Sequence, residues 1–186
     1  VELPGSLRTL GGQAFMDCDG LASVTVPASL EECGYGWSSG IARGPFDGCD
    51  GLKEVKFEPG ARRVPCGLLA GCPGIASVAV PEGVTSVDAY AFAGAKSLSS
   101  VSLPGSLTAI GQGAFSGCAA LASVELPSSL TTVGPSAFEE SALESVVLPG
   151  SVTEVQAGAF RSCAALSSVE LPGSLRTLGG QAFMDC

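Results

Sequence analysis

Cysteine is the residue type in this chain best suited to covalent or metal chemistry, because the sequence has eight cysteines and no histidine. Zinc sites usually combine cysteine with histidine or use paired C-x-x-C motifs, and the sequence has neither. The absence of histidine also removes the commonest general base and the nucleophiles that such a base activates. We therefore predict that the protein is not an enzyme and has no zinc site.

Six of the eight cysteines recur at one position of a repeated pattern. Two repeats have Ala95 and Ser141 at this position, so it requires a small side chain, and we predict buried free thiols there. Cys33 and Cys66 lie outside it. For this pair, the alternatives are a disulfide in an oxidising compartment and two free thiols. The cysteines at the shared position are Cys18, Cys49, Cys72, Cys118, Cys163 and Cys186.

Four aspartates beside two of these cysteines form a candidate metal site. Asp19 and Asp50 take equivalent positions in adjacent repeats, so we expect their backbones about 5 Å apart and their carboxylates to repel each other. Calcium prefers carboxylate oxygens, although the spacing matches no EF-hand or nonapeptide calcium motif. Neutralisation of the pair by Arg43 or Lys53 is the alternative. The candidate calcium ligands are Asp17, Asp19, Asp47 and Asp50, and no other cofactor is expected.

An insertion near residues 34–44, GYGWSSGIARG, contains Tyr35 and Trp37, the only tryptophan of the chain. Aromatic side chains on a glycine-rich loop are good anchors for a sugar ring or a protein surface. The alternative is that Trp37 folds back and fills a gap at the edge of the fold. Basic residues that follow in the sequence complete the candidate binding site and suit an acidic partner, including another copy of the chain: Arg43, Lys53, Lys56, Arg62 and Arg63. The alternative for each of them is an ordinary solvated charge.

A repeat of about 23 residues positions all of these groups. It becomes visible when the chain is cut before each valine of a recurring V-x-L-P segment. The repeats begin at residues 1, 24, 55, 78, 101, 124, 146 and 169, and the second contains the insertion. Units this short bury no core alone, so each must stack on its neighbours.

The sequence of residues 169–186, VELPGSLRTLGGQAFMDC, is identical to that of residues 1–18. Exposed positions such as Gln13 and Gln181 are free to differ when only folding is selected, so the fold alone does not explain this identity. We predict that 168 residues form one period of a longer tandem array, followed here by the start of the next period.

The repeats resemble the Treponema-type, or BspA-like, class of leucine-rich repeat, whose pattern is approximately L-x-x-V-x-L-P-x-S-L-x-x-I-G-x-x-A-F-x-x-C. The cleanest copy, residues 101–123, matches it at Leu103-Pro104, Ile110-Gly111, Ala114-Phe115 and Cys118. The resemblance spans the whole chain. It implies an extracellular or cell-surface microbial protein concerned with adhesion and partner binding.

The predicted fold is one leucine-rich-repeat solenoid over residues 1–186. Alternation in each L-x-x-V-x-L segment predicts a short strand, and these strands should pair in parallel as one continuous sheet. Proline after each strand ends it. The opposite side should be irregular, with a short 3₁₀-helical turn near residues 113–117. Seven repeats should advance roughly 35 Å.

Composition limits the function classes. The formal net charge of −9 argues against nucleic acid and anionic membranes as partners, and the apolar runs are too short to insert into a membrane. The outward strand positions are mostly serine and alanine, which suits close packing against a similar surface, or no contact at all, better than tight recognition of one ligand. We therefore expect a structural component of an extracellular fibre, sheath or adhesive stalk that self-associates. The alternative is an adhesion module that binds protein or glycan through the repeat-two loop.

Overall fold

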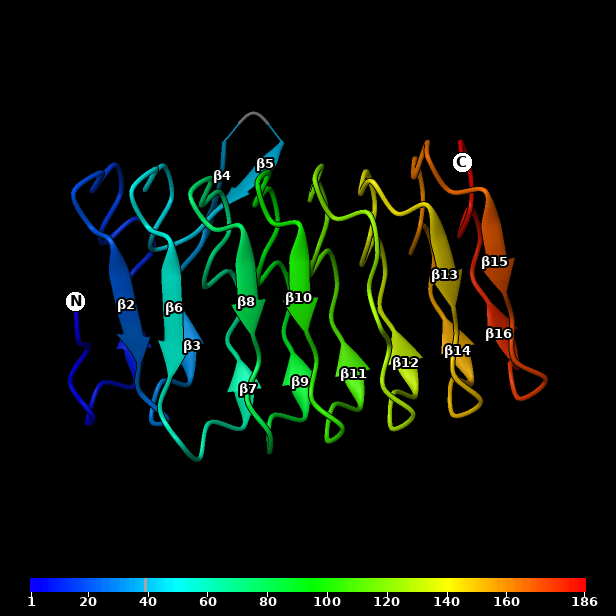
Figure 1. Cartoon of the computed structure of the whole chain (residues 1–186), viewed down its shortest axis with the longest axis horizontal. Coiled ribbons are helices and arrows are strands. Elements are labelled where there is room, and N and C mark those ends of the chain that lie inside the picture. Colours follow the sequence, from blue (N-terminus) through cyan, green and yellow to red (C-terminus); the bar gives the residue numbers. More distant parts are fainter. Residues whose placement is uncertain (39) are drawn as a thin grey trace.

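The computed structural model describes residues 1–38 and 40–186, so Ser39 of the predicted insertion lies outside the described residues. The chain forms a solenoid whose coils lie side by side along one axis, with the N-terminus and the C-terminus at opposite ends (Figure 1). Within the described ranges, no helix has the length and hydropathy needed to cross a membrane.

The L-x-x-V-x-L segments form the first side of each coil. Their strands pair in parallel as β2 with β6, β8 with β10, and β13 with β15, so our prediction of one continuous sheet is wrong. Each strand is short, and prolines such as Pro27, Pro81 and Pro104, which have no N–H to donate, limit the ladder between coils. The strands are β2 (Ser23–Val26), β6 (Glu54–Phe57), β8 (Ser77–Ala79), β10 (Ser100–Ser102), β13 (Ser145–Val147) and β15 (Ser168–Glu170).

A second parallel ladder, absent from our prediction, runs along the adjacent side of the coils. It comprises the pair β1–β3 and a six-stranded sheet in the order β16-β14-β12-β11-β9-β7. Gly111, directly after the strand Ala109–Ile110, lets the backbones of two adjacent coils approach closely, because a Cβ atom at this residue would lie 2.8 Å from the Ala89 nitrogen. The strands are β1 (Thr9–Leu10), β3 (Glu32–Cys33), β7 (Arg63–Val64), β9 (Ser86–Val87), β11 (Ala109–Ile110), β12 (Thr132–Val133), β14 (Glu154–Val155) and β16 (Thr177–Leu178).

The third side consists of turns, and the described residues contain no helix, so the predicted 3₁₀ segment is also wrong. Along these turns, backbone N–H groups donate hydrogen bonds alternately to a carbonyl of the same coil and to a carbonyl of the next coil. The Ala114 N–H donates to the Gly111 carbonyl (3.3 Å), whereas the Phe115 N–H donates to the Ala137 carbonyl of the next coil (2.7 Å). Left-handed φ angles at Gly113 (57°) and Gly117 (70°) interrupt the consecutive local bonds that a 3₁₀ helix requires.

A hairpin leaves the coil in repeat two and projects from the solenoid (Figure 1). Its strands β4 (Gly36–Ser38) and β5 (Ile41–Arg43) pair antiparallel, with Trp37 opposite Ala42. The hairpin accounts for the extra length of repeat two, and it is the element that displays the predicted aromatic residues.

The core is a column of phenylalanines inside the coils. Successive rings from Phe92 through Phe115, Phe138 and Phe160 to Phe183 are stacked with centroids 5.1–5.3 Å apart and nearly parallel planes. This separation is close to the spacing of strands in a sheet, so the backbone ladders and the ring stack share one pitch.

Candidate binding groove beside the repeat-two hairpin

The hairpin leans over the turns of repeat four and brings three aromatic side chains together. The rings of Trp37 and Tyr90 meet edge to face with centroids 4.9 Å apart, and the Tyr35 ring is tilted against Tyr90 at 5.4 Å. Trp37 nevertheless keeps 57% of its surface exposed. The indole therefore packs back against the solenoid, as one of the two interpretations expects, and still presents a large apolar face to solvent. Its role as a binding anchor stays a prediction.

Two backbone positions allow this contact. A Cβ atom at Gly67 would lie 2.7 Å from the Tyr35 Cβ, so the absence of a side chain at residue 67 makes room for Tyr35. Tyr90 takes the equivalent position one repeat later and has φ 57°, where Gly113 has the same angle in the repeat after that. The same left-handed angle recurs at Gln13, Ser136 and Gln181 in other repeats, so it belongs to the turn of the coil.

The hairpin and the turns enclose a groove made of two adjoining hollows of about 280 and 290 Å³. These volumes suit a small ligand or one unit of a larger ligand. Both hollows are lined by Trp37, Tyr90, Ser116 and Glu140, with Lys96 at one end and Arg161 at the other. The groove thus combines an aromatic wall with hydroxyl, carboxylate, ammonium and guanidinium groups.

Charges within the groove are largely balanced. The Arg161 Nε donates to Glu139 Oε1 at 2.7 Å, and the two side chains form an ion pair. Burial, followed by the neighbouring Tyr35, raises the pKa of Tyr90, so its phenol remains a hydrogen-bond donor at neutral pH. This arrangement suits hydrogen bonding and ring stacking, and it favours a neutral polar ligand over a strongly charged one.

An ion pair anchors the base of the hairpin. Arg43 Nη1 donates to both carboxylate oxygens of Asp47, at 2.9 and 3.1 Å, and Asp47 is only 3% exposed. Within the described part of the chain, the buried Arg43 Nε has no hydrogen-bond partner. Arg43 is therefore paired within the chain, with 32% of its side chain exposed, and its predicted role in partner binding stays a prediction.

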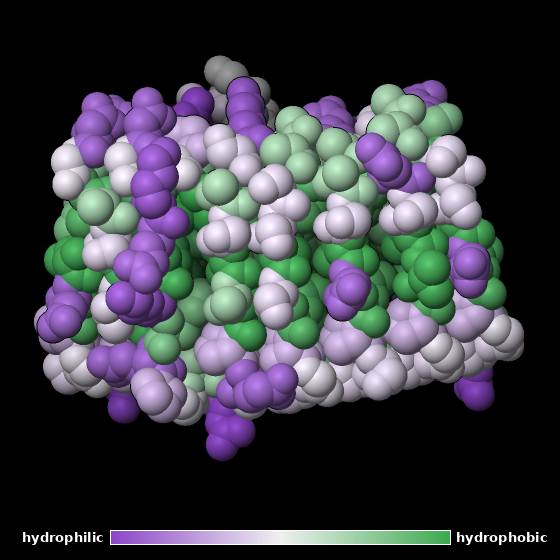
Figure 2. Space-filling model, in the orientation of Figure 1, coloured by the Kyte–Doolittle hydropathy of each residue, from purple (hydrophilic) through white to green (hydrophobic). Residues whose placement is uncertain are grey.

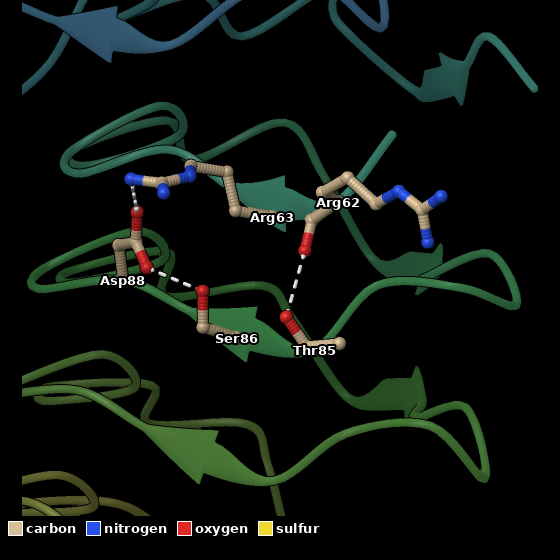
Figure 3. Close-up of polar contacts among 5 residues, drawn as sticks. All are labelled: Arg62, Arg63, Thr85, Ser86 and Asp88. Atoms are coloured by element: carbon tan, nitrogen blue, oxygen red, sulfur yellow. Dashed lines mark hydrogen bonds and ion pairs between the residues drawn. The ribbon is translucent and has the colours of Figure 1, made fainter. Parts of the chain in front are cut away.

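The other predicted basic residues are distributed around repeat three. The Lys53 ammonium donates to the Asp50 carbonyl at 2.8 Å, and Lys56 pairs with Glu54 at 3.1 Å on β6. Figure 3 shows Arg63, the first residue of β7, and Arg62, the residue before it, extending in different directions. Arg63 pairs with Asp88 at 3.4 Å, and Asp88 also accepts from the Ser86 hydroxyl at 2.7 Å. None of these four lines the groove at Trp37.

The aspartates predicted as calcium ligands do not converge. Asp47 is paired with Arg43, and the Asp17 carboxylate lies against Gly48, where a Cβ atom would be 2.1 Å from its Oδ1. Asp19 and Asp50 are exposed. Residues 1–38 and 40–186 contain no group of three or more cysteine, aspartate or glutamate side chains arranged to hold a metal ion.

Cys33 and Cys66 are free thiols that line one hollow together with Arg63 and Asp88. Burial, and secondarily the nearby Cys66, raises the pKa of Cys33 to about 12. The Cys33 thiol is therefore protonated at neutral pH and is a poor nucleophile. The disulfide between this pair stays a prediction. At the shared position, Cys49, Cys72, Cys118 and Cys163 are buried, whereas Cys18 and Cys186 in the end coils are exposed.

Comparison with known proteins decides the family. The profile of the BspA type Leucine rich repeat region matches the chain in six copies, over residues 1–37, 38–93 and 62–186. The chain belongs to this family. A search of curated proteins finds no match.

Several solved structures resemble this BspA-type solenoid along its whole length. A leucine-rich repeat protein of T. pallidum is 27% identical with a TM-score of 0.64, and the alignment covers 100% of this chain and 75% of that one. A leucine-rich repeat protein of Bacteroides ovatus is 24% identical with a TM-score of 0.57, covering 100% and 63%. The pneumococcal vaccine antigen PcpA is 18% identical with a TM-score of 0.55, covering 96% and 58%. This chain therefore spans less than two thirds of the last two proteins, and those two likenesses concern the fold alone.

Sequence reasoning missed most of the groove, including Tyr90, Lys96, Glu140 and Arg161. A usable signal was present in the columns of the BspA-type repeat: Tyr90 stands where Gly67 and Gly113 stand in the neighbouring repeats. Residues that hold the coil together recur at the same position of each repeat. Residues that differ from this pattern and lie close together in space therefore mark a candidate functional surface.

Proposed function

We propose that the chain is a structural element of an extracellular or cell-surface fibre, sheath or adhesive stalk, built from tandem 168-residue periods that associate with one another. The resemblance of the repeats to the BspA-like class supports the extracellular location. The family and its structural neighbours are repeat scaffolds, which is consistent with a non-enzymatic role.

The observation that carries the proposal is the pair of interfaces around the duplicated segment. Residues 1–18 stack on repeat two, where Phe15 and Phe46 are 5.2 Å apart, and residues 169–186 stack on repeat seven, where Phe160 and Phe183 are also 5.2 Å apart. Because the two segments have the same sequence, one coil is able to join repeat seven of one period to repeat two of the next. The solenoid then continues across the period boundary at an unchanged pitch.

The lateral face supports regular association along such a rod. Strands β8 and β10 present small outward residues, among them Ser77, Ser100 and Ser102. Figure 2 shows that this central stretch lacks the hydrophilic cluster that covers the β2 and β6 end. A flat surface repeated once per period allows identical lateral contacts at a fixed spacing. Imaging of chains with one, two and three periods tests the proposal, because a continuous solenoid lengthens by the same step each time.

The groove supports a second candidate function, that of an adhesion module for a protein or glycan. Its exposed indole and mixed polar rim favour a neutral sugar unit, which has an apolar face for stacking and hydroxyl groups for hydrogen bonds. On this hypothesis, the coils are a scaffold that holds the hairpin against the repeat-four turns.

Replacement of Trp37 by alanine tests the second function. Aromatic anchors at binding sites contribute roughly 2 kcal/mol or more, so we expect about 30-fold weaker binding to the best ligand found on a panel of immobilised neutral glycans. The thermal midpoint should change little because the side chain is mostly exposed.

Val147→Ala is the matched control, since Val147 is 58% exposed and lies on β13, outside the groove. Equal loss of binding in both variants, or retention of binding in Trp37→Ala, would show that the indole is not the anchor.

A further inference from the structure

We infer that Cys33 and Cys66 form a reversible disulfide, and that this cross-link fixes the base of the repeat-two hairpin to the next coil. The pair is a modification site that belongs to neither of the proposed functions, and its test depends on neither of them. Its position follows from an interruption of the second ladder, described next.

The second ladder is interrupted between repeats two and three. Strand β3 pairs with β1 and strand β7 pairs with β9, so within residues 1–38 and 40–186 no strand pairing joins these two coils on this side. One coil further on, the Asp88 N–H donates to the Val64 carbonyl at 2.9 Å. Pro65 stands at the position equivalent to Asp88 and has no N–H to donate. Coils two and three therefore lack this backbone connection.

The interruption coincides with a hollow of about 340 Å³ that both thiols line. Cys33 is 7% exposed, whereas Cys66 is partly exposed, so one thiol of the pair is accessible to a solute. Burial, followed by the neighbouring Cys66, raises the pKa of Cys33, which means that the two sulfur atoms are close enough to interact electrostatically. The hollow thus holds two nearby free thiols that belong to adjacent coils.

Both cysteines differ from the residues that the repeat has at their positions. The neighbouring coils have the branched aliphatic residues Leu10 and Val64 at the position of Cys33. The next coil has Ala89 at the position of Cys66. The other six cysteines share one recurring position, so only these two are additions to the repeat. That both additions line one hollow favours a paired role over two independent thiols.

The pair lies at the base of the hairpin. The chain enters the hairpin directly after Cys33, because Tyr35 follows two residues later and precedes β4. In the next coil, Gly67 directly follows Cys66, and a Cβ atom at Gly67 would lie 2.7 Å from the Tyr35 Cβ. A disulfide would therefore fix the strand that enters the hairpin beside its contact with coil three. The ion pair described above already holds the strand that leaves the hairpin.

Thiol–disulfide exchange with a small disulfide such as oxidised glutathione supplies the chemistry. The accessible Cys66 sulfur attacks as its thiolate, forms a mixed disulfide and releases one glutathione. The Cys33 thiol then loses its proton, and its sulfur displaces the second glutathione from Cys66. Two protein thiols lose two electrons and two protons, and oxidised glutathione takes them up to become two thiols. The second step should be the slower one, since the Cys33 thiol is protonated at neutral pH.

Oxidation of the folded chain tests the inference. The chain carries Cys18→Ser and Cys186→Ser, because these two cysteines are exposed, and oxidised glutathione is the probe. We expect the intact mass to fall by two hydrogen atoms and peptide mapping to link Cys33 to Cys66. Hydrogen exchange of the hairpin amides at residues 36–38 and 41–43 should slow about tenfold or more, because the cross-link suppresses local opening. Dithiothreitol should reverse both changes.

Cys66→Ser is the matched control, since it keeps a small side chain at a partly exposed position. It should form no cross-link, and its hairpin exchange should not respond to the oxidant. If this variant does not fold, Cys33→Ala removes the other thiol and should behave in the same way. Recovery of Cys33 and Cys66 as free thiols after prolonged oxidation would overturn the inference. A cross-link that leaves hairpin exchange unchanged would also overturn it, because the hairpin would then not be fixed by the disulfide.

Discussion

Replacing Phe115 by alanine is expected to lower the free energy of unfolding by about 3–5 kcal/mol, because truncation of a fully buried phenylalanine leaves a cavity that the neighbouring coils cannot fill. Phe115 is completely buried and lies between Phe92 and Phe138, at centroid distances of 5.1 and 5.2 Å. Chemical denaturation followed by circular dichroism measures the loss.

Phe183→Ala is the matched control for the ring column. Phe183 occupies the last coil, is only partly buried and stacks on a single ring, that of Phe160. We expect it to cost less than half as much as Phe115→Ala. Equal costs at the two positions would show that the stack does not stabilise the coils from both sides, and the account of the core would be wrong.

Arg43→Ala is expected to destabilise the hairpin by about 3 kcal/mol, since breaking a buried ion pair leaves the other charge without a partner. The group left without a partner is the Asp47 carboxylate, which is 3% exposed and accepts two hydrogen bonds from Arg43. Trp37, the only tryptophan, lies on the same hairpin and reports its detachment from Tyr90 through fluorescence.

A double-mutant cycle provides the internal check. Arg43→Ala combined with Asp47→Ala should recover part of the stability lost in Arg43→Ala alone, because the buried charge is gone. Arg62→Ala is the control at an exposed guanidinium and should stay within about 0.5 kcal/mol of wild type. Additive effects at residues 43 and 47 would mean that the pair does not hold the hairpin.

The sequence predicted the repeat, its register and its core well, because each apolar residue recurs at the same position of every coil. Phe115 and Phe138, for example, occupy one column and stack in space. The second ladder escaped prediction since two-residue strands such as Ala109–Ile110 are too short to show alternation. The 3₁₀ turn was wrongly expected because hydrogen bonds to the next coil, such as that from the Phe115 amide to Ala137, leave no local sequence signature.

The site was predicted only in part for a related reason. Tyr35 and Trp37 were recognisable as a departure from the repeat, but their direction was not, and it is the contact with Tyr90 that defines the groove. Conversely, Arg43 and Arg63 are close in sequence yet lie on different sides of the coil, each paired with its own carboxylate. In a solenoid, residues at equivalent positions of adjacent repeats are neighbours in space, and closeness along the chain is a poor guide to closeness in space.

Electron microscopy of purified chains containing one, two and three periods, each ending in residues 169–186, tests the central claim most directly. If the duplicated coil joins the periods, the particles should be continuous rods that lengthen by roughly 35 Å with each period, the advance of seven coils at the spacing of parallel strands. Separate particles connected by flexible joints, with no constant increment, would contradict a continuous solenoid and with it the structural function.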